Sequence, residues 1–416
     1  MIYAQPTEAA APQPGRLLQQ HLARLRPALL ALVVIAAPCA VAAAGTGPQN
    51  RAQTAQDDAY GAAATDTARV LAGLQPGQGS RLDRIVAHPA WRTHHAEFER
   101  NWGRLDAERF VKMREWRDRE LKPVESACDT LFYPFGGPDF LNAFVLFPGC
   151  NRYLLFGLEP VGSIPALDHL ADAEIDAVLT GLRASLSDIF LRDYFITKTM
   201  MSELRTQAVD GTLPLLLGFL ARADARSVEV RMDAPWAGAG AAGGASGTPP
   251  SAPPRPRRPA SVTVRFTLPG DGRVRTLVYS RVQMQDAAFS RQTAMLAYLD
   301  GVAPLTTLLK SASYLMHDDR FSRVRSLILT RSRAVLEDDT GVPFRFFDKA
   351  AWDLTLFGRY SRPVKDFNYG FQPDLEAAYH DASAAAHELP FSFGYHWKDG
   401  ASSVILAIRR GAPAQQ

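Results

Sequence analysis

The residues best suited to chemistry lie in one short stretch of the sequence. A β-prone run ends at Tyr133, a turn containing Gly136 and Gly137 follows, and Asp139 precedes a short apolar run. A second β-prone run ends just before Glu159, which follows Gly137 by 22 residues. Two carboxylates beside a phenol and a glycine turn can bind a polar ligand or take part in acid–base chemistry.

The order of elements around these residues explains why they should meet. The sequence predicts a strand at 129–134, a helix at 140–147 and a second strand at 151–158. A strand, a helix and a strand in this order form a parallel βαβ unit. Ligands bind beyond the carboxyl ends of such strands. We therefore predict a ligand cleft lined by Tyr133, Gly136, Gly137, Asp139 and Glu159.

This stretch resembles the first half of nucleotide- or S-adenosylmethionine-binding Rossmann folds. The spacing from Gly137 to Glu159 is close to that of the ribose-binding acid in dinucleotide folds. A helix that begins after two glycines can also hold an anion. Against this, Phe135-Gly-Gly-Pro-Asp is not G-x-G-x-x-G, and Pro138 and Asp139 suit a first helical turn through capping alone. Free nucleotides are also scarce outside the cytoplasm, so we predict a different ligand and no cofactor.

The first 44 residues have the charge and hydropathy pattern expected of an export signal. Arginines precede the uncharged apolar run at 28–37, and Ala42-Ala43-Ala44 follows it. This order is typical of a secretory signal peptide, and we expect the mature chain to begin near Gly45. The run is short for an uncleaved membrane anchor, and Cys39 follows Pro38, which fits a lipoprotein signal poorly. We therefore expect a periplasmic or secreted bacterial protein with no stable membrane span after processing.

The cysteines agree with this location. Cys39 would leave with the signal peptide, and Cys128 and Cys150 would remain in an oxidising compartment. Each stands just before one strand of the predicted βαβ unit, so neighbouring strands would bring the two side by side. The sequence therefore predicts a Cys128–Cys150 disulfide. The alternatives are two buried free thiols, or two strands separated by a third strand between them.

Several classes of function find no support in the sequence. The first 44 residues hold three arginines and one glutamate, so the remaining chain carries 43 basic and 42 acidic residues and has no nucleic-acid footprint. Glu337, Asp338 and Asp339 precede Thr340-Gly341 and would suit a hard cation, but a solvated turn is the favoured interpretation. The motifs H-E-x-x-H, G-x-S-x-G and the P-loop do not occur, so neither a metal site nor a serine hydrolase is predicted.

The domain organisation follows from composition. We predict a signal peptide at 1–44, a flexible lead at 45–84 and a single globular α/β domain at 85–410. Residues 233–260 are rich in Ala, Gly, Ser and Pro, which indicates a disordered insertion. Alternating runs on both sides of it indicate a swollen loop within one antiparallel meander.

The predicted fold is α/β. It consists of a mixed sheet with a parallel Rossmann-like βαβ start at about 128–160, an antiparallel meander at about 227–282 and flanking helices. In the C-terminal third we predict a helix at 304–317, strands at 325–329 and 343–347, and a last strand at 402–409.

Three strings in the chain resemble a family of uncharacterised exported bacterial proteins, namely Leu131–Phe140 (LFYPFGGPDF), Leu155–Gly162 (LFGLEPVG) and Leu336–Pro343 (LEDDTGVP). The resemblance implies one domain and an envelope location, but no mechanism. We therefore keep two hypotheses. The favoured one is a non-enzymatic domain that binds a small molecule or an envelope partner. The alternative is an enzyme that uses Asp139 and Glu159 at the strand ends.

Overall fold

The structure, a computed structural model, describes residues 61–186, 190, 210–237, 259–360, 362–363, 365–381, 385–396 and 402–411. They belong to one compact unit, Pro48–Gln416. The predicted signal peptide and residues 45–60 of the predicted flexible lead lie outside the described residues. Residues 61–71 are helical, and Val70 and Leu71 are buried in the main core. This part of the predicted lead is therefore packed against the domain.

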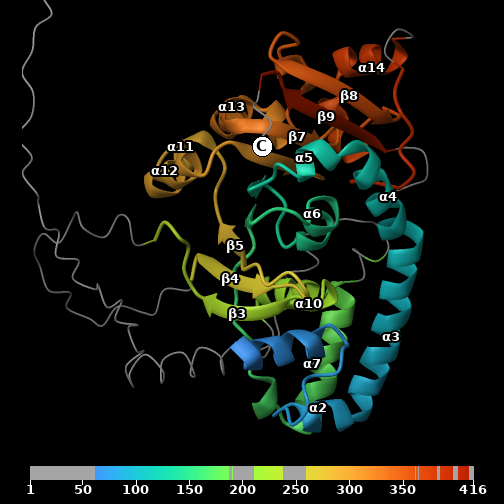
Figure 1. The fold of residues 1–416 in the computed structure, drawn as a ribbon, viewed down its shortest axis with the longest axis vertical. Coiled ribbons are helices and arrows are strands. Elements are labelled where there is room, and N and C mark those ends of the chain that lie inside the picture. The colour runs from blue at the N-terminus through green and yellow to red at the C-terminus, as the bar shows by residue number, and fades with distance from the viewer. Residues whose placement is uncertain are drawn as a thin grey trace, which may run out of the picture. The chain divides into compact units, whose positions relative to one another are not determined.

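The described residues form a nine-stranded mixed sheet in the order β3-β4-β5-β2-β1-β6-β7-β9-β8. Figure 1 shows β3, β4 and β5 together at one end of this sheet and β7, β9 and β8 together at the other. The strands are β1 (Thr130–Tyr133), β2 (Arg152–Gly157), β3 (Arg226–Arg231), β4 (Ser261–Thr267), β5 (Arg275–Arg281), β6 (Leu305–Leu309), β7 (Ser332–Glu337), β8 (Trp352–Gly358) and β9 (Ser403–Arg409). The five central strands β5, β2, β1, β6 and β7 are parallel, and the outer pairings are antiparallel. The predicted α/β class, with a parallel start and an antiparallel meander, is confirmed.

The parallel strands have the order of a Rossmann fold. Taken along the chain they are β1, β2, β5, β6 and β7, and in space they stand in the order 3-2-1-4-5. The chain builds outward from β1 to one side and then returns to add β6 on the other. In such sheets ligands bind at this switch point, beyond the carboxyl ends of the strands.

Helices cover both faces of the sheet. They are α2 (Asp83–Ala87), α3 (Pro89–Leu105), α4 (Val111–Glu120), α5 (Lys122–Glu125), α6 (Phe140–Leu146), α7 (Asp172–Ser185), α10 (Leu213–Arg222), α11 (Asp286–Phe289), α12 (Thr293–Gly301), α13 (Ser322–Arg331) and α14 (Pro373–His380). Side chains alternate between the faces along a strand, so Leu131 and Tyr133 of β1 join the core under α3, α4, α6, α7 and α10. Phe132 points into the core under α11, α12 and α13. Central parallel strands are buried on both faces for this reason.

The elements at the amino end of the βαβ unit lie as predicted. β1 and β2 are parallel neighbours, with Thr130 opposite Arg152. Cys128 and Cys150 stand just before these strands and lie at disulfide distance, with Cα atoms 4.8 Å apart.

The ends of the predicted insertion belong to the domain. β3 and β4 pair antiparallel, as the swollen-loop hypothesis requires. Before the gap, the Thr263 hydroxyl donates to the Asp233 carbonyl at 2.7 Å, and the Trp236 ring contacts those of Phe156 and Tyr298. Residues 238–258 lie outside the described residues. A variant that shortens this loop should therefore keep residues 233–237.

Three predictions for the C-terminal third are wrong. Residues 305–309 form β6, not a helix, and only 315–317 of the predicted helix are helical, as a 3₁₀ turn. Residues 325–329 lie inside α13, and residues 344–346 form a 3₁₀ turn. β6 is buried at every position, and an unbroken apolar run does not distinguish a strand from a buried helix.

Candidate functional site

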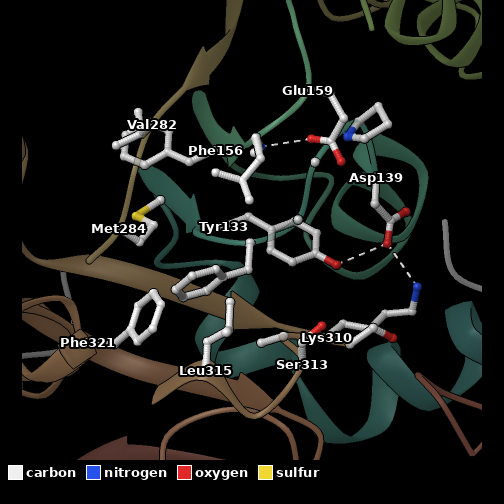
Figure 2. A pocket seen from close by; sticks show the side chains of 18 of the residues that line it. Tyr133, Asp139, Phe156, Glu159, Val282, Met284, Lys310, Ser313, Leu315 and Phe321 are labelled. Carbon is white, nitrogen blue, oxygen red and sulfur yellow. Dashed lines mark hydrogen bonds and ion pairs between the residues drawn. The ribbon is translucent and has the colours of Figure 1, made fainter. Parts of the chain in front are cut away.

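A pocket of about 320 Å³ opens at the carboxyl ends of β1, β2, β5 and β6 (Figure 2). It lies at the switch point of the parallel strands, where β1 and β6 are neighbours. All five predicted cleft residues line it, namely Tyr133, Gly136, Gly137, Asp139 and Glu159. The structure therefore brings together side chains that the sequence separates by up to 26 positions.

The turn after β1 needs its glycines. Gly137 has φ +54°, a left-handed backbone that other residues rarely adopt. A Cβ on Gly136 would lie 2.6 Å from the Tyr133 ring, so the ring packs directly on the backbone. Phe135 also has a positive φ of 64°, although it has a side chain. This turn sets the Tyr133 ring against the pocket.

Asp139 joins the turn to α6 and to β6. Its carboxylate accepts from the Asn142 backbone N–H at 3.3 Å, which caps α6, and from the Asn142 side-chain amide at 2.9 Å. The Tyr133 hydroxyl donates to Oδ2 at 3.0 Å, and Lys310 Nζ donates to the same oxygen at 2.9 Å (Figure 2). The Lys310 and Asp139 side chains are 1% and 5% exposed. A buried charge of this kind persists because it is paired and hydrogen-bonded.

Glu159 is fixed beside the end of β2. Its Oε2 accepts from the Leu158 backbone N–H at 3.0 Å and from the Tyr279 hydroxyl at 3.2 Å. A Cβ on Gly157 would lie 2.4 Å from Oε2, and a Cβ on Gly137 would lie 3.5 Å from it. The two glycines therefore leave the space that the carboxylate occupies.

The loop after β6 has an unusual backbone. Ser311, Ser313 and Tyr314 have positive φ angles of 54°, 55° and 53°, and none of them is glycine. Tyr395, which also lines the pocket, binds this loop: its hydroxyl donates to the Ser311 carbonyl at 3.0 Å and lies 2.7 Å from the Ser313 hydroxyl. A left-handed non-glycine residue persists only where the surrounding structure holds it in place. Such residues are found most often at functional sites.

The pocket has a polar and an apolar side. Tyr133, Asp139, Glu159 and Lys310 form the polar side (Figure 2). The apolar side contains Phe156, Val282, Met284, Leu315 and Phe321. An amphipathic pocket with few fixed polar groups is typical of a small-molecule site.

The predicted solvated turn at Glu337, Asp338 and Asp339 is wrong, because all three acids are buried. Burial raises the pKa of all three carboxyl groups above their ordinary values, and for Asp338 the charge of the neighbouring Asp339 adds to this. The local composition predicted that these acids are exposed to solvent. Instead, groups distant in the sequence donate hydrogen bonds to Asp338 and Asp339. Ser311 N–H donates to Asp338 at 2.8 Å, and the Tyr314 hydroxyl donates to Asp339 at 2.5 Å.

These contacts give the acids a structural role. Asp338 and Asp339 anchor two of the left-handed residues of the loop that borders the pocket. Within the described residues, no group of three or more His, Cys, Asp or Glu side chains is arranged to hold a metal ion.

Glu337 makes stability depend on pH. A carboxyl whose pKa is raised on folding binds more protons when folded, so the free energy of unfolding falls as the pH rises above the ordinary value of 4.5. We expect Glu337→Gln to reduce the stability loss between about pH 5 and about pH 7 by roughly 1–3 kcal/mol. Glutamine still accepts from the Val342 N–H that Glu337 Oε2 binds at 2.9 Å.

Urea denaturation at the two pH values measures this effect. The exposed Glu115 gives a matched control, Glu115→Gln, whose pH dependence should equal that of the wild type. An unchanged slope in Glu337→Gln would show that the carboxyl titrates normally in the folded protein.

Sequence reasoning missed the part of the pocket that comes from β5 and β6. Three lining residues lie in the segment 304–317, which was predicted as a helix and was therefore not considered as part of the cleft, namely Lys310, Ser311 and Ser313. Val282 is the last residue of the predicted meander at about 227–282, and Met284 lies two residues beyond it, so the end of the meander could have identified both. Tyr395 is distant in sequence and gave no local signal.

Comparisons with known proteins found no matching family model, curated protein or solved structure. Within the described part of the chain, every helix is too short or too polar to cross a bilayer.

Proposed function

We propose that this chain is an exported protein that binds a small organic molecule in the pocket at the carboxyl ends of β1, β2, β5 and β6. The observation that supports this most strongly is the convergence of Tyr133, Asp139, Glu159 and Lys310 on one pocket at the switch point. An apolar wall faces these groups, so the pocket suits a ligand with one polar and one apolar part.

The proposed location depends on the amino-terminal sequence and the cysteines. Residues 28–44 have the pattern of a signal peptide, and Cys128 and Cys150 lie at disulfide distance. We propose that the two form a disulfide in the oxidising environment outside the cytoplasm. The resemblance of three strings to exported bacterial proteins supports the same location.

The state of Asp139 favours binding over catalysis. Four donor groups from Tyr133, Asn142 and Lys310 occupy its two oxygens. A general base must be able to reach a substrate proton with a lone pair. In this proposal Asp139 therefore positions Tyr133 and Lys310. An enzyme that uses Asp139 and Glu159 is the second candidate, favoured by the presence of both carboxylates in one pocket.

Mass spectrometry of small molecules bound to protein from the envelope fraction tests the proposal. We expect a molecule to co-purify with the wild type and to be lost from Leu315→Trp, which fills the apolar side of the pocket. Val274→Trp is the matched control. Val274 is 40% exposed and directly precedes β5, at the amino ends of the parallel strands, whereas the pocket lies at their carboxyl ends. The intact mass of the same sample shows whether the chain begins near Gly45.

Two results would contradict the proposal. A molecule retained equally by Leu315→Trp and Val274→Trp binds elsewhere. A chain that still contains residues 28–37 is not processed as an exported protein.

A further inference from the structure

We infer that the ligand of this pocket is a ribonucleoside without a phosphate group, with its ribose diol at Glu159 and its base against the apolar wall. The inference rests on the proposed function, since it names the chemical class of the ligand for the same site. Three separate features of the pocket support it: the position of an acid, the position of an apolar segment, and the charge.

The acid stands where ribose hydroxyls are recognised in sheets of this order. Glu159 follows β2, the strand beside β1, and comes 22 residues after Gly137. In dinucleotide-binding sheets of this order, an acid about 20 residues beyond a G-x-G-x-x-G turn accepts a hydrogen bond from the ribose, and Glu159 stands at the corresponding place although the turn here has only two glycines. Gly137 and Gly157 leave space for the carboxylate, and Tyr279 and the Leu158 N–H fix its orientation.

The apolar segment lies beside the acid. Val282 N–H donates to the Gly157 carbonyl at 2.9 Å, so the chain that leaves β5 runs along the end of β2. Val282 and Met284 line the pocket on the same side as Phe156 (Figure 2). This wall can bury the faces of a flat ring, and burial of apolar area favours binding. Gln283 and Gln285 also line the pocket and bring amide donors and acceptors suited to the edge of a base.

The charge of the pocket disfavours phosphate. In dinucleotide-binding folds the diphosphate lies at the helix N-terminus after the glycine turn. Here the Asp139 carboxylate caps α6 and accepts the Asn142 N–H. Among the described lining residues, Asp139 and Glu159 are acids, and the base Lys310 is paired with Asp139. A phosphate at this position would therefore be repelled by a carboxylate, whereas a neutral or cationic 5′ substituent would not be repelled.

Binding of defined nucleosides to the full-length mature protein tests the inference. The probes are adenosine, guanosine, uridine and S-adenosylmethionine, each measured by isothermal titration calorimetry up to about 1 mM. We expect at least one of them to bind. For that base, the 2′,3′-dideoxynucleoside and the 5′-monophosphate should each bind about tenfold or more weakly, because the first lacks the diol and the second adds charge.

Glu159→Gln should weaken the same nucleoside by about tenfold or more, and Glu115→Gln, on the exposed face of α4, should not. Should Glu159→Gln fail to fold, the comparison of diol and dideoxy ligands on the wild type still decides the matter. Equal affinity for those two ligands, or a monophosphate that binds as tightly as the nucleoside, would overturn the inference.

Failure of this inference is distinguishable from failure of the proposed function. If no nucleoside binds while a different co-purified molecule is lost from Leu315→Trp, the pocket binds ligand and the nucleoside class is wrong. If Leu315→Trp retains every bound molecule, both the proposed function and this inference fall.

Discussion

Replacement of Lys310 by methionine is expected to lower the free energy of unfolding by about 3–5 kcal/mol. The substitution removes the ammonium from an ion pair whose side chains are 1% and 5% exposed. Asp139 then stays buried with donors from Tyr133 and Asn142 but without a neutralising charge. A buried charge without its partner costs far more than the pair contributes, because its hydration has already been lost. Urea denaturation at neutral pH, without added ligand, measures the change.

The surface pair Arg331–Asp300 provides a matched control. Its atoms are 2.7 Å apart, but the side chains are 48% and 52% exposed. Arg331→Met should therefore change stability by no more than about 1 kcal/mol. The double variant Asp139→Asn/Lys310→Met should recover part of the loss, since it leaves no buried charge. A loss in Lys310→Met no larger than that in Arg331→Met would show that water reaches the pair.

The first half of the pocket could be predicted because local chemistry specifies it. Two apolar runs of strand length flank a glycine turn and a short helix, and each run has its polar residue at the carboxyl end. Parallel strands bring those ends to one edge, so Tyr133, Asp139 and Glu159 could be placed together from the sequence.

The second half could not be predicted because its signals are tertiary. The Leu-Thr-Thr-Leu-Leu run of β6 is buried on both faces and shows no alternation. Because residues 304–317 were predicted as a helix, Lys310 was not placed at the carboxyl ends of the strands, where Asp139 lies. The left-handed loop after it contains Ser311, Ser313 and Tyr314, and no glycine marks it in the sequence.

The buried acids show the same dependence on distant groups. Glu-Asp-Asp followed by Thr-Gly reads locally as a solvated turn. Asp338 is buried because the loop after β6 supplies a backbone N–H, and Asp339 because Tyr314 supplies a hydroxyl. The residues that most define the loop beside the pocket are therefore those whose environment the sequence predicts least well.

Reduction of the Cys128–Cys150 pair is expected to lower the free energy of unfolding by about 3 kcal/mol. The two residues are separated by 22 positions, and the chain-entropy model gives this value for a closed loop of that size. Both residues lie at the amino ends of β1 and β2, whereas the pocket lies at the carboxyl ends. Ligand affinity should therefore be unchanged in the reduced protein, while its urea midpoint falls.

The effect must be separated from that of the side chains themselves, since both cysteines are buried and their replacement can leave a cavity. Wild-type protein is therefore compared with and without reductant, and Cys128→Ala/Cys150→Ala is treated in the same way. Reductant should shift the wild type alone, because the variant has no bond to break. Cys39 would leave with the signal peptide, so no third thiol should compete for pairing. Two titratable thiols in denatured, unreduced protein from the envelope would refute the disulfide, and they would also remove one support for the proposed export.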